Sequence, residues 1–155
     1  MKVLFLDIDG VVNSHRWYKS RVRYPVPRTR AQYDEMEFDP EAVKLVKMIV
    51  KETGCKVVLS STWRLTEVGC KAVKKHCCNF ISTTPSLSRP NDTSWEYRER
   101  GREIIDWLMK NGVVENYAIL DDDPDFFDWQ PLFQTKNKIG ITPSIAKKVI
   151  KHLNK

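Results

Sequence analysis

Apolar residues along the chain recur in two patterns that alternate from the amino end to the carboxyl end. Short apolar runs are typical of strands buried in a sheet and lie at 3–6, 56–59, 80–81, 117–120 and 132–135. Longer stretches with apolar residues at helical spacing lie between or after them, at 40–53, 64–78, 100–111 and 143–153. Strands that alternate with helices predict an α/β domain, in which helices cover both faces of a central parallel sheet.

Two of the predicted helices have specific end signals. Asp39 before Pro40 is typical of a helix start, because the aspartate can accept from free amide groups and proline needs no hydrogen bond in the first turn. Gly54 marks the end of the same helix. Thr142 before Pro143 predicts the start of the last helix in the same way.

A basic segment at about 14–38 fits neither pattern. It contains two prolines, five aromatic residues and no clear period, so we expect a long loop or a small insert. Within 14–33, six basic residues and no acid give a charge of +6, which equals the formal net charge of the whole chain. Basic residues interleaved with aromatics suit a nucleic-acid strand with stacked bases, and a solvated loop is the alternative. We expect Arg21 and Arg23 to contact the substrate.

The length of 155 residues suits a single domain over 1–155. No apolar run is long enough to cross a bilayer. The apolar amino end carries two aspartates and no small-residue cleavage site, so we expect neither a membrane segment nor a secretory signal. The four cysteines match no common disulfide or zinc-ligand spacing, which favours reduced thiols and a cytoplasmic protein.

Three of the predicted strands end in polar side chains. Asp7 and Asp9 follow the first strand, a Ser-Ser-Thr run begins at Ser60, and consecutive aspartates begin at Asp121. Ligands of parallel sheets bind beyond the carboxyl ends of the strands. We therefore expect these side chains to meet in one site, although acids beside glycine also form ordinary turns.

Carboxylates that meet at one point repel one another unless a bound cation compensates their charge. Oxygen ligands without a convincing histidine or cysteine favour magnesium over zinc. Magnesium keeps coordination positions for phosphate oxygens, and an aspartate beside it can attack phosphorus to form an aspartyl-phosphate. The strand ends therefore predict Mg²⁺ as the cofactor and a phosphate ester as the substrate.

The same residues resemble the haloacid dehalogenase (HAD) superfamily. LFLDIDGVVN is similar to its first motif, Ser60 at the end of VVLS to its second, and ILDDD to its fourth, in the right order. More narrowly, LSSTWR, RGREIIDWL, YAILDDD and QTKNKIGIT resemble the compact HAD domain of "Swiss Army Knife" RNA repair proteins. The resemblance spans most of the chain except the basic segment. It implies a three-layer, Rossmann-like fold without a large cap domain.

The resemblance also implies roles for the matched aspartates. Asp7 would be the nucleophile, and Asp9 the general acid for the leaving group and then the base for the hydrolytic water. Magnesium would be held by Asp7, by the main-chain carbonyl of Asp9 and by Asp121, with Asp122 in support. Val11 stands where the superfamily commonly has threonine, a departure that we expect to affect packing rather than chemistry.

Three assignments have alternatives. Ser60 would hydrogen-bond the transferred phosphoryl group, but Ser61 is close enough to exchange with it. The third motif normally supplies a lysine, which has no obvious equivalent here; Arg100 is the favoured cation and Arg102 the rival. Arg64 is either a second phosphate clamp or a structural ion-pair partner.

We expect the substrate to be a phosphorylated end of RNA or DNA, or a nucleotide, because a site without a cap admits a polymer and the resemblance implies repair. RNA or DNA repair enzymes are the expected partners. One alternative is a 5′-nucleotidase that acts on free nucleotides. Another is a nucleic-acid-binding module without activity, which clustered carboxylates argue against because they repel phosphate. The choices between RNA and DNA and between 3′ and 5′ phosphates stay open.

Overall fold

The computed structural model describes residues 1–21, 38–87 and 99–155. The strands in these ranges are β1 (Lys2–Leu6), β2 (Lys56–Leu59), β3 (Ser82–Thr83), β4 (Asn116–Asp121) and β5 (Leu132–Gln134). The helices are α1 (His15–Arg21), α3 (Pro40–Thr53), α4 (Glu67–His76), α5 (Glu99–Lys110) and α6 (Pro143–Leu153), with a 3₁₀ turn η1 (Thr62–Leu65). All the strands are parallel and form one sheet in the order β3-β2-β1-β4-β5.

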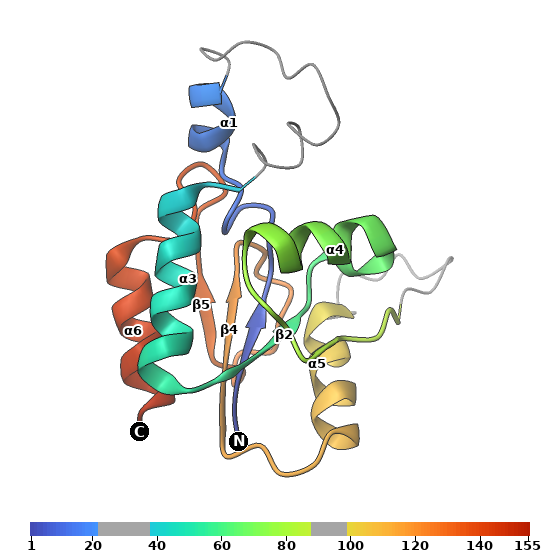
Figure 1. Ribbon diagram of the computed structural model, residues 1–155. Coiled ribbons are helices and arrows are strands. Elements are labelled where there is room, and N and C mark those ends of the chain that lie inside the picture. Colours follow the sequence, from blue (N-terminus) through green and yellow to red (C-terminus); the bar gives the residue numbers. More distant parts are fainter. Residues whose placement is uncertain (22–37, 88–98) are drawn as a thin grey trace.

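Helices cover both faces of this sheet (Figure 1). Successive side chains of a strand point to opposite faces, so Leu4 and Leu6 of β1 pack into the core shared with α3, α4 and α6. Val3 and Phe5 pack on the other face, where Ile104 of α5 joins them. The expected three-layer parallel α/β fold is confirmed, and the described ranges contain no large cap domain.

An aromatic contact fixes α5 against the sheet. The ring of Trp107 meets Phe5 of β1 edge to face at a centroid distance of 5.3 Å, a favoured arrangement for two aromatic rings. The indole N–H of Trp107 also donates to Oγ of Ser82 in β3 at 2.8 Å. These contacts fix the later part of α5, whereas its first turn is held by the amides of Arg100 and Gly101, which donate to Oδ2 and to the carbonyl of Asp125.

The predicted helix ends are confirmed. The side chain of Asp39 accepts from the amide of Glu41, and the side chain of Thr142 accepts from the amide of Ile145. Gly54 ends α3 with φ of 67°, a left-handed conformation that glycine adopts without strain.

Two boundaries differ from the sequence prediction. The single helix predicted over 64–78 is divided into η1 and α4, because Thr66 caps a new helix by accepting from the amide of Gly69. The third strand lies two residues later than predicted, at Ser82–Thr83, where it pairs with the end of β2. Phe80, which suggested a strand, packs its side chain against the core instead.

The basic segment was predicted to be irregular, but its first part forms α1. The amides of His15 and Arg16 donate to the carbonyls of Asn137 and Lys138 at 3.0 and 3.1 Å. The loop between β5 and α6 therefore holds the start of this helix in place. The rest of the segment, at 22–37, lies outside the described residues.

Candidate active site

Asp7 lies at the point where three neighbouring strands end. Because Leu6 pairs with Leu120 in the parallel register of β1 and β4, Asp7 stands beside Asp121. The amide of Asp7 donates to the carbonyl of Leu120, and on the other side the amide of Ser60 donates to the carbonyl of Leu6, both at 3.0 Å. The register of the sheet alone thus brings the three predicted strand ends together.

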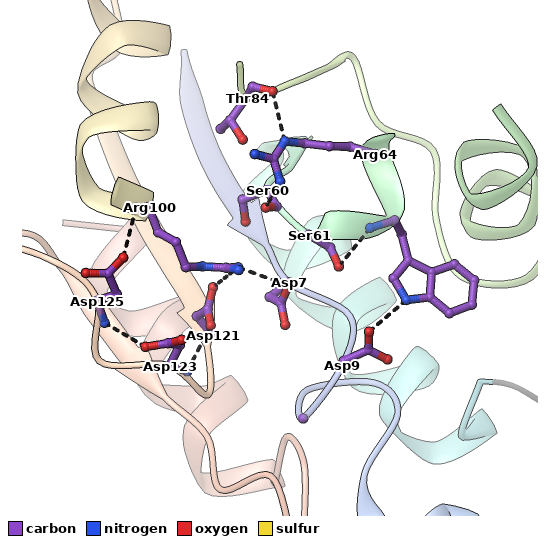
Figure 2. A network of polar contacts seen from close by, with 12 residues as sticks. Asp7, Asp9, Ser60, Ser61, Arg64, Thr84, Arg100, Asp121, Asp123 and Asp125 are labelled. Atoms are coloured by element: carbon purple, nitrogen blue, oxygen red, sulfur yellow. Dashed lines mark hydrogen bonds and ion pairs between the residues drawn. The ribbon is translucent and has the colours of Figure 1, made fainter. Parts of the chain in front are cut away.

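Arg100 in the first turn of α5 lies between the two carboxylates (Figure 2). Its Nη2 donates to Oδ1 of Asp7 at 3.0 Å and to Oδ2 of Asp121 at 2.5 Å. Its amide donates to Oδ2 of Asp125 at 3.2 Å, which ties the start of α5 to the loop after β4. For the third-motif cation the geometry favours Arg100, since Arg102 is exposed to solvent.

Asp122 completes a group of three carboxylates. One oxygen each of Asp7, Asp121 and Asp122 lies within 4.8 Å of the others, so the group could hold a metal ion. Gly10 makes this approach possible: its φ is +75°, and a Cβ at this position would overlap the carboxyl group of Asp122. The carboxylate of Asp9 is outside this group, and a contribution from its main-chain carbonyl stays a prediction.

Burial makes the charges of this group costly. Burial raises the pKa of Asp7, although Arg100 opposes the rise. Burial, and then the charge of Asp7, raises the pKa of Asp121 to about 7. Burial alone would lower the pKa of Arg100, but Asp121 and Asp7 raise it above its usual value. Three ionised carboxylates with one guanidinium carry a formal charge of −2, which a divalent cation would balance.

Asp9 is exposed to solvent and is held by a different set of partners. Nε1 of Trp63 donates to Oδ2 of Asp9 at 2.9 Å, and Nδ2 of Asn13 donates to Oδ1 at 3.4 Å. The ring of Trp63 packs on Phe38 at a centroid distance of 5.3 Å. No local pattern in the sequence indicates that the N–H of Trp63 reaches the end of another strand.

The two serines after β2 have different surroundings. Oγ of Ser60 is buried and has no hydrogen-bond partner in the part of the chain that the structure describes. The side chain of Ser61 already has two hydrogen-bond partners. Its Oγ accepts from the amide of Trp63 at 3.5 Å, and it also hydrogen-bonds Asp7. A buried hydroxyl without a partner is costly unless a ligand completes its hydrogen bonds, which favours Ser60 over Ser61 for the phosphoryl contact.

Arg64 forms its contacts within the protein interior, and only 6% of its side chain is exposed. Its nitrogens donate to the carbonyls of Ser60, Thr84 and Pro85 at 2.7, 3.0 and 3.0 Å, and to Oε2 of Glu103 at 2.7 Å. Burial lowers the pKa of Arg64, and Glu103 opposes this shift. The geometry favours the ion-pair interpretation over the phosphate clamp, with Arg64 joining the ends of β2 and β3 to α5.

Comparison with known protein families identifies the family of this chain. Residues 3–146 match the family model described as the HAD domain in Swiss Army Knife RNA repair proteins. The chain belongs to this family. It is therefore a HAD-superfamily domain, and most HAD proteins are phosphatases or other hydrolases. Neither a curated protein nor a solved structure gave a significant match.

Some predicted features of this HAD domain lie beyond what the structure describes. Arg23 falls within 22–37, and nothing is described of the side chain of Arg21, so their predicted substrate contacts stay predictions.

All four cysteines are free thiols. In the described ranges, no helix combines the length and apolar character needed to span a membrane.

The ion pair of Arg64 with Glu103 generates a stability prediction. We expect Glu103→Gln to lower the free energy of unfolding by about 3 kcal/mol, because it leaves a buried guanidinium without its counter-charge. The matched control is Glu41→Gln, whose exposed pair with Lys44 should contribute less than about 0.5 kcal/mol. Urea denaturation of both variants measures the difference. Unchanged stability in Glu103→Gln, together with a raised KM for a phosphate ester, would instead support the clamp.

Proposed function

We propose that this HAD domain is a magnesium-dependent phosphatase that carries the phosphoryl group on Asp7 and removes a terminal phosphate from a nucleic-acid strand or a nucleotide. The observation that carries the proposal is the meeting of Asp7 and Asp121 beneath Arg100. Two carboxylates buried side by side are costly for a purely structural site. They are useful where a cation and a phosphoryl group bind.

In the first step, a carboxylate oxygen of Asp7 forms a bond to phosphorus while the bond from phosphorus to the ester oxygen breaks. Asp9 gives its proton to that departing oxygen. Arg100 favours the ionised form of Asp7 against the effect of burial. Ser60 donates its free hydroxyl to the phosphoryl oxygens, on which negative charge must be stabilised during transfer.

In the second step, Asp9 takes a proton from a water molecule whose oxygen attacks phosphorus. The bond between phosphorus and Asp7 breaks, and inorganic phosphate leaves. The hydrogen bond from Trp63 keeps the carboxylate of Asp9 on the solvent side of the site in this structure. This exposed position supports a role for Asp9 in proton exchange with both the departing group and the incoming water.

The chemistry of the donor set supports magnesium. Asp7, Asp121 and Asp122 offer only oxygen atoms, the ligands that Mg²⁺ prefers. The formal charge of −2 on the group calls for a divalent partner. Bound there, Mg²⁺ would neutralise charge on the phosphoryl oxygens and bring them next to Asp7.

Two observations support a nucleic-acid end as the substrate. The family is described by its occurrence in RNA repair proteins. In addition, Asp7 is buried whereas Asp9 is exposed, so the phosphate enters the site and the remainder of the substrate points toward solvent. A long nucleic-acid strand can extend from a site with a buried nucleophile and an exposed general acid without being enclosed.

The proposal predicts turnover that requires both magnesium and Asp7. Wild-type protein is assayed with p-nitrophenyl phosphate, mononucleotides, and 3′- and 5′-phosphorylated oligonucleotides, with Mg²⁺ or with a chelator. Asp7→Asn should lower kcat by at least about a thousandfold, because the amide is a poor nucleophile. Asp128→Asn, which alters an exposed aspartate outside the site, is the matched control.

The substrate panel also separates the alternatives. Turnover confined to mononucleotides would indicate a nucleotidase. Tight oligonucleotide binding without hydrolysis of any ester would indicate a binding module and overturn the proposal, as would turnover that survives in Asp7→Asn.

Trp63 is expected to act as a positioning residue for Asp9. Trp63→Phe keeps an aromatic ring beside Phe38 but removes the N–H, a loss of about 1 kcal/mol in the placement of Asp9. We expect kcat/KM for an alkyl phosphate to fall about fivefold. The effect on p-nitrophenyl phosphate should be smaller, because its leaving group needs little help from an acid.

The control is Trp129→Phe, since Trp129 is 65% exposed and lies outside the site. Kinetics of both variants with both esters provide the measurement. Equal losses with the two esters in Trp63→Phe would contradict a role through Asp9 and leave Trp63 as a packing residue.

A further inference from the structure

A second concave surface lies beside the carboxylate group. It is a groove with a volume of about 360 Å³, lined by His15, Arg16 and Lys19 of α1 and by Lys138 and Ile139 of the loop between β5 and α6. We call it the basic groove. Neither the proposed phosphatase chemistry nor the family match assigns it a role.

The basic groove combines apolar walls with positive charge. Its lining is almost entirely apolar, although most of its side chains end in a cation. Long basic side chains produce this combination when their methylene stems form the walls and their charged ends stay in water. A nucleotide has matching parts, because its base offers a flat apolar face and its phosphate an anion.

The cations of the basic groove are not neutralised by the described part of the chain. Arg16, Lys19 and Lys138 are exposed to solvent, and none of them forms an ion pair with an acid that the structure describes. Three charges around one hollow that no described acid compensates attract an anion far better than dispersed surface lysines do.

Direct contacts join the basic groove to the carboxylate group. Asn137 precedes Lys138, and its side chain hydrogen-bonds the carboxylate of Asp122. Its main-chain carbonyl accepts from the amide of His15 at 3.0 Å. One residue therefore contacts the acidic group with its side chain and the first residue of α1 with its backbone, so the two features are neighbours on the carboxyl edge of the sheet.

The connecting loop is fixed on its other side as well. Oγ1 of Thr135 donates to the carbonyl of Gly10 at 2.7 Å, and the amide of Ile141 donates to the carbonyl of Val11 at 2.9 Å. Both contacts join the loop to the segment that follows Asp7. The position of the basic groove relative to the nucleophile is thus set by the fold.

We propose that the basic groove binds the nucleotide next to the terminal phosphate, and so holds the single-stranded end of a nucleic acid in place for the reaction at Asp7. This inference rests on the proposed phosphatase function. The carboxylates repel a polyanion, and Arg16, Lys19 and Lys138 offset that repulsion for the phosphate that follows the reacting one. A substrate without this second phosphate cannot benefit.

The test is the triple variant Arg16→Ala/Lys19→Ala/Lys138→Ala. The measured quantity is the ratio of kcat/KM for a phosphorylated single-stranded oligonucleotide to kcat/KM for p-nitrophenyl phosphate. We expect this ratio to fall at least about tenfold at low salt, and the salt slope of log(kcat/KM) for the oligonucleotide to become shallower by about 0.7, as for the loss of one phosphate contact to a single strand.

The matched control is Lys47→Ala/Lys51→Ala/Lys148→Ala, which removes the same charge from exposed positions on α3 and α6. Its ratio should stay near the wild-type value. An equal fall in both triple variants would show a general charge effect and overturn the inference, as would an unchanged ratio in the groove variant.

The proposed phosphatase function and the proposed role of the basic groove can fail separately. If wild-type protein hydrolyses no phosphate ester, the phosphatase function fails. Fluorescence anisotropy with a phosphorylated oligonucleotide then still tests the groove, and loss of binding in the groove variant but not in the control would support it. If esters are hydrolysed but the ratio does not respond to the groove variant, the groove inference alone fails.

Discussion

The site depends on a charge balance at the ends of two adjacent strands. Asp7 and Asp121 are placed side by side by the register of β1 and β4, and burial makes their simultaneous ionisation unfavourable. Arg100 supplies one compensating charge through its contacts with both carboxylates. With Asp122 the group has a formal charge of −2, so the same arrangement that makes the strand ends costly could hold a divalent cation.

This constraint divides the site into two halves. On the buried side lie Asp7, with Arg100 bonded to it, and Ser60, whose hydroxyl has no partner among the described residues. On the exposed side, Trp63 and Asn13 hold Asp9 in contact with solvent. In the proposed reaction, this division would separate transfer of the phosphoryl group from proton exchange with the departing oxygen and with water. A long substrate, as proposed, would extend outward from this site along the basic groove.

The sequence predicted the layers of the fold and the strand ends, because both follow from periodicity and from the geometry of parallel sheets. It could not predict contacts between elements far apart in the chain. The hydrogen bond from Trp63 to Asp9 forms only because η1 lies near the end of β1. The ion pair of Arg64 with Glu103 forms only because α5 packs beside β2. Two wrong boundaries have local causes. The helix predicted over 64–78 is divided because Thr66 caps a new helix. The strand predicted at 80–81 lies later because Phe80 contributes its side chain to the core without being part of a strand.

Chemical trapping of the phosphorylated residue tests the central claim most directly. Protein turning over a phosphate ester in the presence of Mg²⁺ is quenched and treated with borohydride, which reduces an aspartyl-phosphate to homoserine, and the modified residue is located by peptide mass spectrometry. The account predicts reduction at Asp7, dependent on both the ester and the cation, and none at Asp9 or Asp121. Turnover with no reduced aspartate, or with reduction at another aspartate, would contradict it.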